Sequence, residues 1–225
     1  MSDRGLWALS LGCIHLKELI VSDCPFISDK RLQFVASQCL ELTSLAVNGT
    51  KVSSFGIRNF LVSANNLQNL DLSLLTISGE LFLFMEEHHV PWKRLVLSGC
   101  KGITAAGILG LALACPLLVH LNLEGAHCLT DEIMEILSQS LPNITYLCLN
   151  YCSLLTDSSF FCLLKNCRHL EELEMESTGL GWGTSGMALD QECYKLKSLK
   201  IAWNKPIGDV ALRMHWHTLS SFSLS

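Results

Sequence analysis

Cysteine offers the most reactive chemistry in this sequence, because a thiol can form a disulfide, bind a metal or act as a nucleophile. The chain of 225 residues holds 11 cysteines. Their number is odd, and no two stand in the Cys-x-x-Cys spacing of zinc ribbons or thioredoxin-like sites. They recur instead at a fixed interval: Cys100 and Cys115 are 15 residues apart, and so are Cys152 and Cys167. This recurrence predicts internal repeats with buried, reduced cysteines.

Histidine pairs and a glycine-rich stretch also invite a chemical interpretation, and we find a structural one for each. His88 and His89 lack acidic or cysteine partners at metal-ligand spacing, and His215 and His217 are two residues apart in a predicted helix, where they do not share a face. Residues 179–186 contain four glycines but no lysine in the phosphate-loop position, so we expect a divergent loop. No catalytic motif appears. We therefore expect no metal, no cofactor and no enzymatic activity.

Leucines follow the cysteines in register along the whole chain. After each repeat position comes the pattern x-x-L-x-x-L-x-L, as in Leu16, Leu19 and Val21. Alternation of this kind predicts a short strand with one buried face. Steps of 25 or 26 residues separate the repeat positions, which are Cys13, Cys39, Ala64, His89, Cys115, Leu141, Cys167 and Cys193.

A predicted helix follows each strand. Ser28-Asp29, Thr130-Asp131 and Thr156-Asp157 precede apolar residues at helical spacing, and Ser or Thr at this place predicts a helix N-cap. One strand and one helix bury too little apolar surface to be stable alone, so neighbouring units must stack.

These repeats resemble the cysteine-containing leucine-rich repeat of the F-box/LRR proteins. The best local match is CIHLKELIVSDCPFISDKRLQFVASQC, residues 13–39, and the resemblance covers essentially the entire chain. It implies an α/β leucine-rich-repeat solenoid with a concave parallel sheet and convex helices. We predict one array over residues 1–225, with about eight repeats and cut at both ends, as in a fragment or a shortened isoform.

Alternate strand positions have no packing duty and should face the concave side, where a partner can bind. Acidic residues gather there late in the sequence, which indicates either a site for a basic segment of a protein partner or a solvated acidic face. Cys148 should also face this side, where it could be a reactive thiol. The candidate partner-binding residues are Glu124, Tyr146, Asn150, Tyr151, Glu172, Glu174, Glu176, Lys200 and Trp203.

The resemblance implies protein recognition, as the substrate-binding part of an SCF-type ubiquitin ligase. In that family an F-box recruits the adaptor Skp1, and this chain has none, since repeats begin at residue 2; a Skp1-type partner is expected only if an F-box lies upstream in a parent chain. The alternatives are a repeat adaptor unrelated to ubiquitin and, less favoured, a secreted or receptor ectodomain.

Composition agrees with an ordinary folded protein, and we expect it in the cytoplasm or nucleus because its cysteines are expected to be reduced. Apolar residues make up 49% of the chain and charged residues 16%, which excludes a disordered chain. The net charge of −5 argues against nucleic acid as a partner. No signal peptide opens the chain, and no apolar stretch is long enough to predict a membrane span.

Overall fold

The computed structural model describes residues 2–88, 91–181, 195–204 and 220–223. Two compact units divide the chain, residues 1–118 and residues 119–225. Each unit is described by itself below.

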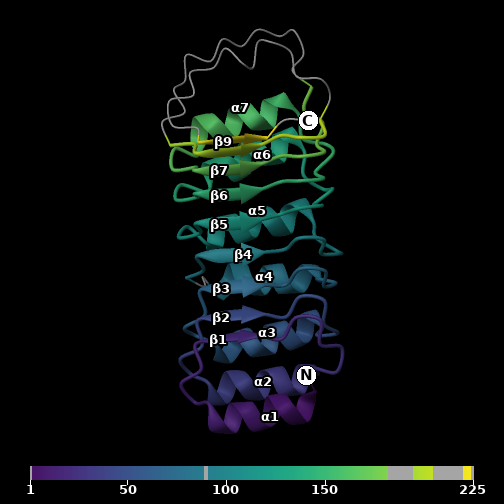
Figure 1. The fold of residues 1–225 in the computed structure, drawn as a ribbon, viewed down its shortest axis with the longest axis vertical. Coiled ribbons are helices and arrows are strands. Elements are labelled where there is room, and N and C mark those ends of the chain that lie inside the picture. The colour runs from purple at the N-terminus through teal and green to yellow at the C-terminus, as the bar shows by residue number, and fades with distance from the viewer. Residues whose placement is uncertain (1, 89–90, 182–194, 205–219, 224–225) are drawn as a thin grey trace. The chain divides into compact units, whose positions relative to one another are not determined.

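Unit 1 alternates helices and three-residue strands. Its four strands pair in parallel in chain order, and Figure 1 shows them in front of the helices. The register is regular: Leu19, Leu45, Leu70 and Leu95 lie side by side. The elements in order are α1 (Asp3–Gly12), β1 (Glu18–Ile20), α2 (Asp29–Gln38), β2 (Ser44–Ala46), α3 (Ser54–Ser63), β3 (Asn69–Asp71), α4 (Gly79–His88), β4 (Arg94–Val96) and α5 (Ala105–Ala114).

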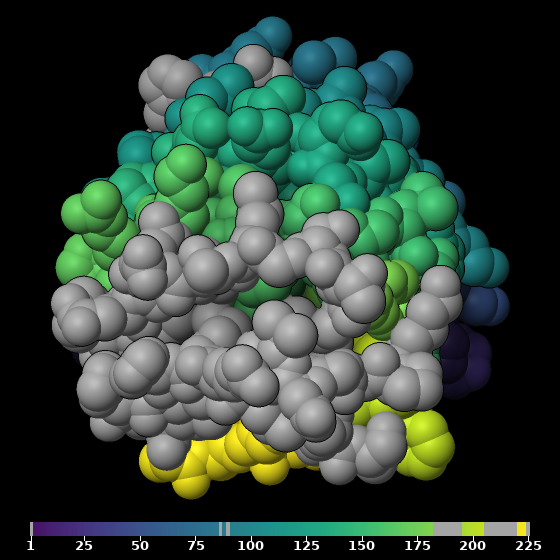
Figure 2. All heavy atoms as spheres, turned by 90° about the horizontal axis from the view of Figure 1, so that it is seen from above, coloured from purple at the N-terminus to yellow at the C-terminus, as the bar shows by residue number. Residues whose placement is uncertain are grey.

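Unit 2 continues the same pattern. Its strands also pair in parallel in chain order, and Leu121, Leu147, Leu173 and Leu199 form the matching row. Figure 2 views the molecule from the end of unit 2, with β9 in yellow. The described elements are β5 (His120–Asn122), α6 (Asp131–Gln139), β6 (Tyr146–Cys148), α7 (Asp157–Asn166), β7 (Glu172–Glu174), β8 (Ser198–Lys200) and β9 (Ser221–Ser223).

The leucine pattern accounts for the core of both units. Each strand from β1 to β8 is centred on the second apolar residue of its motif, and the residues at the motif positions are buried except Leu16, which is half-buried; Leu147 and Leu149, for example, are fully buried. Apolar residues of the helices cover them, such as Phe160 and Leu163 from α7. The alternating pattern therefore fixes which face of each strand is covered.

The repeat cysteines act as small buried donors. Cys39, Cys115 and Cys167 are buried, as predicted, whereas Cys13, at the first repeat position, is exposed. The Cys39 thiol donates to the backbone oxygen of Cys13 at 3.4 Å, and the Cys167 thiol donates to that of Ser138 at 3.6 Å. A thiol at this position thus fills the core and also contacts a backbone carbonyl of the preceding repeat. All ten cysteines within the described ranges are free thiols.

The Ser/Thr-Asp pairs connect neighbouring repeats rather than only capping their own helices. Thr156 is at the N-cap of α7, as predicted, and its backbone N–H and hydroxyl both donate to the Asp131 carboxylate of the preceding repeat, at 2.9 and 2.5 Å. The Asp3 carboxylate accepts the same pair of bonds from Ser28, at 2.8 and 2.6 Å. Ser28 makes no side-chain bond to its own helix, so the predicted capping bond is absent there.

A left-handed turn follows every strand from β1 to β8. At this place the backbone φ lies between 53° and 73° in Asp23, Gly49, Leu74, Gly99, Gly125, Tyr151, Ser177 and Trp203. The conformation aims the N–H of the turn residue at the next repeat: Tyr151 donates to the oxygen of Glu176 at 2.9 Å, and Ser177 donates to that of Ala202 at 3.1 Å. The parallel ladder is extended in this way, although only glycine adopts such a φ without strain.

The fold confirms the predicted leucine-rich-repeat solenoid of parallel strands and helices. The division into one array over residues 1–225 stays a prediction. The predictions for residues 182–186 of the glycine-rich stretch, for His89, His215 and His217, and for Cys193 lie outside the described residues.

Candidate protein-binding site

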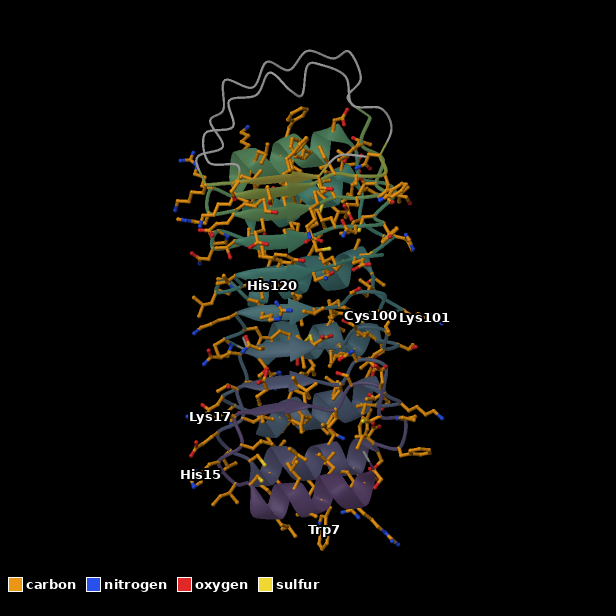
Figure 3. All side chains as sticks on the ribbon, viewed as in Figure 1. Trp7, His15, Lys17, Cys100, Lys101 and His120 are labelled. Atoms are coloured by element: carbon orange, nitrogen blue, oxygen red, sulfur yellow. The ribbon has the colours of Figure 1, made fainter. Side chains whose placement is uncertain are left out.

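The face of the unit 2 sheet that the helices leave uncovered, here called the open face, carries three rows of side chains. His120, Tyr146, Glu172 and Ser198 form the first row, and Asn122, Cys148, Glu174 and Lys200 form the second. Figure 3 labels His120 on this face. The third row lies two residues beyond the second and contains Glu124, Asn150, Glu176 and Ala202. Seven of the nine predicted binding residues thus share one surface.

Both oxygens of the Glu174 carboxylate accept hydrogen bonds within the open face, and its predicted role as a contact for a partner cation stays a prediction. Its Oε1 accepts from Lys200 Nζ at 2.8 Å, and its Oε2 accepts from the Asn150 amide at 3.1 Å. Burial raises the pKa of Glu174, but the bonds from Lys200, Asn150 and Cys148 and the charge of Lys200 outweigh it, so the pKa lies below its ordinary value. The same ion pair raises the pKa of Lys200.

Asn150 and Cys148 are buried residues of the open face. Asn150 is only 8% exposed, and its Oδ1 accepts from the Glu176 backbone N–H at 2.8 Å. Cys148 is 1% exposed. Burial, with the charges of Glu174 and Glu124, raises the pKa of Cys148 to about 12, so the thiol stays protonated at neutral pH. The alternative of an accessible, reactive Cys148 is therefore wrong, and Asn150 positions the Glu176 backbone.

Tyr146 and His120 form a flat aromatic pair in the first row. Their ring centroids are 3.9 Å apart, and the rings are within 2° of parallel. Burial, together with Cys148 and Glu174, raises the pKa of the Tyr146 hydroxyl, which therefore stays neutral. This pair supplies a rigid, half-buried apolar platform beside Glu172.

The remaining carboxylates leave the open face acidic. The three rows hold Glu124, Glu172, Glu174 and Glu176 against the single ammonium of Lys200, a balance of 1 − 4 = −3. Glu172 is exposed and Glu176 is half-buried, and within the described part of the chain neither makes an ion pair within 4 Å. Opposite charge on a partner would be attracted here.

Two aromatic side chains line the edge of the open face where the strands end; we call Tyr151 and Trp203 the aromatic rim. Both occupy the left-handed turn position, with φ of 60° and 61°. Tyr151 is 54% exposed and Trp203 is 73% exposed, so neither is buried by the fold. Sequence reasoning found the two residues but not their strained backbone, for which the recurrence of glycine at this position, in Gly49, Gly99 and Gly125, is the signal.

Unit 1 shows different chemistry at the equivalent positions. Its uncovered sheet positions carry mainly small side chains, such as Ser44, Ala46, Asn48, Asn69 and Ser73.

In the portion of the chain that the structure describes, no three His, Cys, Asp or Glu side chains gather as a metal site. No helix within the described ranges is long and apolar enough to cross a bilayer.

Comparison with protein families agrees with this geometry. The model of the "Leucine Rich repeat" family matches residues 12–30 and 192–214. F-box/LRR-repeat protein 4 of Bos taurus is 27% identical over 175 residues, which are 76% of this chain and 28% of that protein. BTB/POZ domain-containing protein FBL11 of Arabidopsis thaliana is 29% identical over 152 residues, which are 67% of this chain and 16% of that protein. The chain therefore spans less than a third of either curated relative.

Two solved structures share the fold at low identity. Rad7, in the crystal structure of the yeast Rad7 and Elc1 complex, superposes with a TM-score of 0.54 at 16% identity, covering 90% of this chain and 67% of that one. Internalin C2 of Listeria monocytogenes gives a TM-score of 0.52 at 19% identity, covering 88% of this chain and 84% of that one.

The fold and its open face define a leucine-rich-repeat protein, a class whose members typically bind other proteins. Within that class, the curated relatives confirm the resemblance found in the repeats: the chain is similar to the repeat region of the F-box/LRR proteins.

Proposed function

We propose that this chain recognises a protein target for an SCF-type ubiquitin ligase, and that the target binds the open face of unit 2 through a basic segment. The observation that carries the proposal is the acidity of that face: among the described residues neither Glu172 nor Glu176 makes an ion pair within 4 Å, and the Tyr146 ring stacks on His120 beside Glu172. The fold requires none of these side chains, because the strands are held by their buried leucines.

The relatives support the ligase part of the proposal. One curated relative is named an F-box/LRR-repeat protein, and the Rad7 structure contains a protein partner, Elc1. A chain of this kind acts in the cytoplasm or nucleus, where its cysteines stay reduced. A Skp1-type adaptor would bind an F-box in a parent chain, and the repeats would hold the target.

Position-specific cross-linking in cells tests where the target binds. A photo-cross-linking amino acid replaces Ser198, which lies beside Glu172 on the open face, or Glu135, which is exposed on α6. We expect one protein to be cross-linked from position 198 and not from position 135. Cross-linking from position 135 alone would refute the open face as the target site.

The ligase role is tested on the same target. We expect Skp1 to co-purify with the protein that carries these repeats, and we expect ubiquitin on the cross-linked target to decrease when that protein is depleted. A target that binds position 198 without Skp1 and without a change in ubiquitin would point to a repeat adaptor instead.

A further inference from the structure

The aromatic rim has a geometry that suits one kind of partner side chain. Tyr151 follows β6 and Trp203 follows β8, so two strand spacings, about 10 Å, separate their backbones. Between them, on the rung of β7, the turn residue is Ser177, whose side chain is much smaller than either ring. Two rings that contact both faces of a flat group need about 7 Å between them, which this spacing allows.

A carboxylate stands beside that space. Glu176 directly precedes Ser177, and its backbone N–H is held at 2.8 Å by Asn150 Oδ1. Ser177 is held as well, since its N–H donates to the oxygen of Ala202. Backbone hydrogen bonds therefore fix the rung between the two aromatic residues on both sides, and the Glu176 side chain on that rung is half-buried.

The backbone at the rim argues against a folding role for the two rings. Bulky residues rarely occupy φ near +60°, and a strained residue that persists in a fold is a reason to look for a function. At the equivalent turns Gly49, Gly99 and Gly125 show that glycine suffices for the fold. Tyr151 and Trp203 are also largely exposed, so packing does not explain them.

We propose that the aromatic rim and Glu176 bind an arginine side chain of the protein partner, with its guanidinium between Tyr151 and Trp203. Guanidinium is flat, stacks on aromatic faces and pairs with carboxylates, whereas the lysine ammonium is a compact, strongly hydrated point charge. This inference rests on the proposed protein-binding function and adds the residue type that the partner must present.

Nuclear magnetic resonance of the whole chain tests the proposal with three pentapeptides, Gly-Ser-X-Ser-Gly, blocked at both ends. X is arginine, lysine or citrulline, which has the shape of arginine without its charge. We expect the arginine peptide to shift the Trp203 indole N–H and the Ser177 amide. We expect lysine to bind at least about threefold more weakly and citrulline at least about tenfold more weakly.

Variants localise the effect. Tyr151→Gly and Trp203→Gly should each weaken binding of the arginine peptide at least about fivefold, as should Glu176→Gln. Two matched controls should leave it unchanged: Leu74→Gly, which makes the same backbone change at the equivalent turn of unit 1, and Glu135→Gln, which removes a charge from α6. The unchanged amide spectrum elsewhere shows that each variant is folded.

Several results would overturn the proposal: no shift with the arginine peptide, equal shifts with arginine and citrulline, equal affinity for lysine, or shifts that survive both glycine variants at the rim. Such a failure is separable from failure of the proposed function. Cross-linking from position 198 without arginine binding would support the proposed function and refute the arginine site at the rim. Arginine binding without any cross-linked target would support the arginine site and refute the proposed function.

Discussion

Tyr151 provides a sharp test of the turn geometry, because the usual order of glycine and alanine should be reversed there. Two variants, Tyr151→Gly and Tyr151→Ala, lose the same exposed ring and differ only in the residue that must adopt φ of 60°. At ordinary positions alanine is the more stable of the two. At this turn we expect the glycine variant to be more stable than the alanine variant.

The magnitude follows from two opposing terms. An L-residue in the left-handed conformation costs about 1–2 kcal/mol, which glycine avoids. Glycine loses about 0.4–1 kcal/mol through its greater freedom in the unfolded chain. The midpoints of the two ranges, about 1.5 and about 0.7 kcal/mol, give an expected difference of about 0.8 kcal/mol in favour of glycine. The backbone N–H of residue 151 donates to the backbone oxygen of Glu176, and both variants keep this N–H. The hydrogen bond therefore does not contribute to the difference.

Urea unfolding followed by circular dichroism measures this difference, provided that the two variants show the same slope m. Ala8→Gly in α1 gives the control of opposite sign: Ala8 is exposed within a helix, so glycine should destabilise by about 1 kcal/mol. If Tyr151→Ala is as stable as Tyr151→Gly or more stable, the strained turn and the argument built on it are wrong.

Three further predictions concern single side chains. Asp131→Ala should lower the free energy of unfolding by about 1.5–3 kcal/mol in urea, because Thr156 and Ser159 lose their charged acceptor, whereas Glu135→Ala on the same helix should change it by less than about 0.5 kcal/mol. Although burial opposes it, hydrogen bonding lowers the pKa of Asp131, so this contribution is present above the unfolded pKa of about 3.9 and should disappear as the pH falls through the folded pKa; a difference between the two proteins that does not shrink as the pH falls below about 3.9 would contradict the assignment. Lys200→Gln should raise the pKa of Glu174 in a carboxyl NMR titration, while Lys197→Gln, which frees Glu171 instead, should leave it unchanged. Thiol labelling of the native chain at pH 8, read by mass spectrometry, should modify Cys13 first among the ten cysteines of the described ranges and spare Cys148, Cys152 and Cys167, whose pKa values burial raises to about 12; early labelling of Cys148 would contradict its burial.

Periodicity made the fold predictable. A motif such as Leu16, Leu19 and Val21 states which residues are buried, and its recurrence states that the units stack. The helix starts at Ser28, Thr130 and Thr156 were also predictable, because Ser and Thr favour the N-cap position. These features depend on residues that are close in the sequence, so they can be read from the sequence alone.

Contacts between repeats were harder to predict. Asp131 was expected to serve its own helix, yet it accepts hydrogen bonds from Thr156, 25 residues away. Glu174 was expected to be open, yet Lys200 from the next strand neutralises it. Cys148 has the register of the open face but is too short to reach past its neighbours. Each outcome depends on side-chain length and on a partner one repeat away, which strand alternation alone does not encode.

The affinity of the cross-linked target for the purified chain, with and without a reversed charge at Glu176, tests the central claim most directly. We expect Glu176→Lys to raise the Kd at least about tenfold at low salt and to flatten its dependence on ionic strength, since a half-buried attractive charge becomes repulsive. Glu135→Lys on α6 should have little effect. An unchanged Kd in Glu176→Lys, or an equal loss in both variants, would contradict recognition of a basic partner by the open face and its rim.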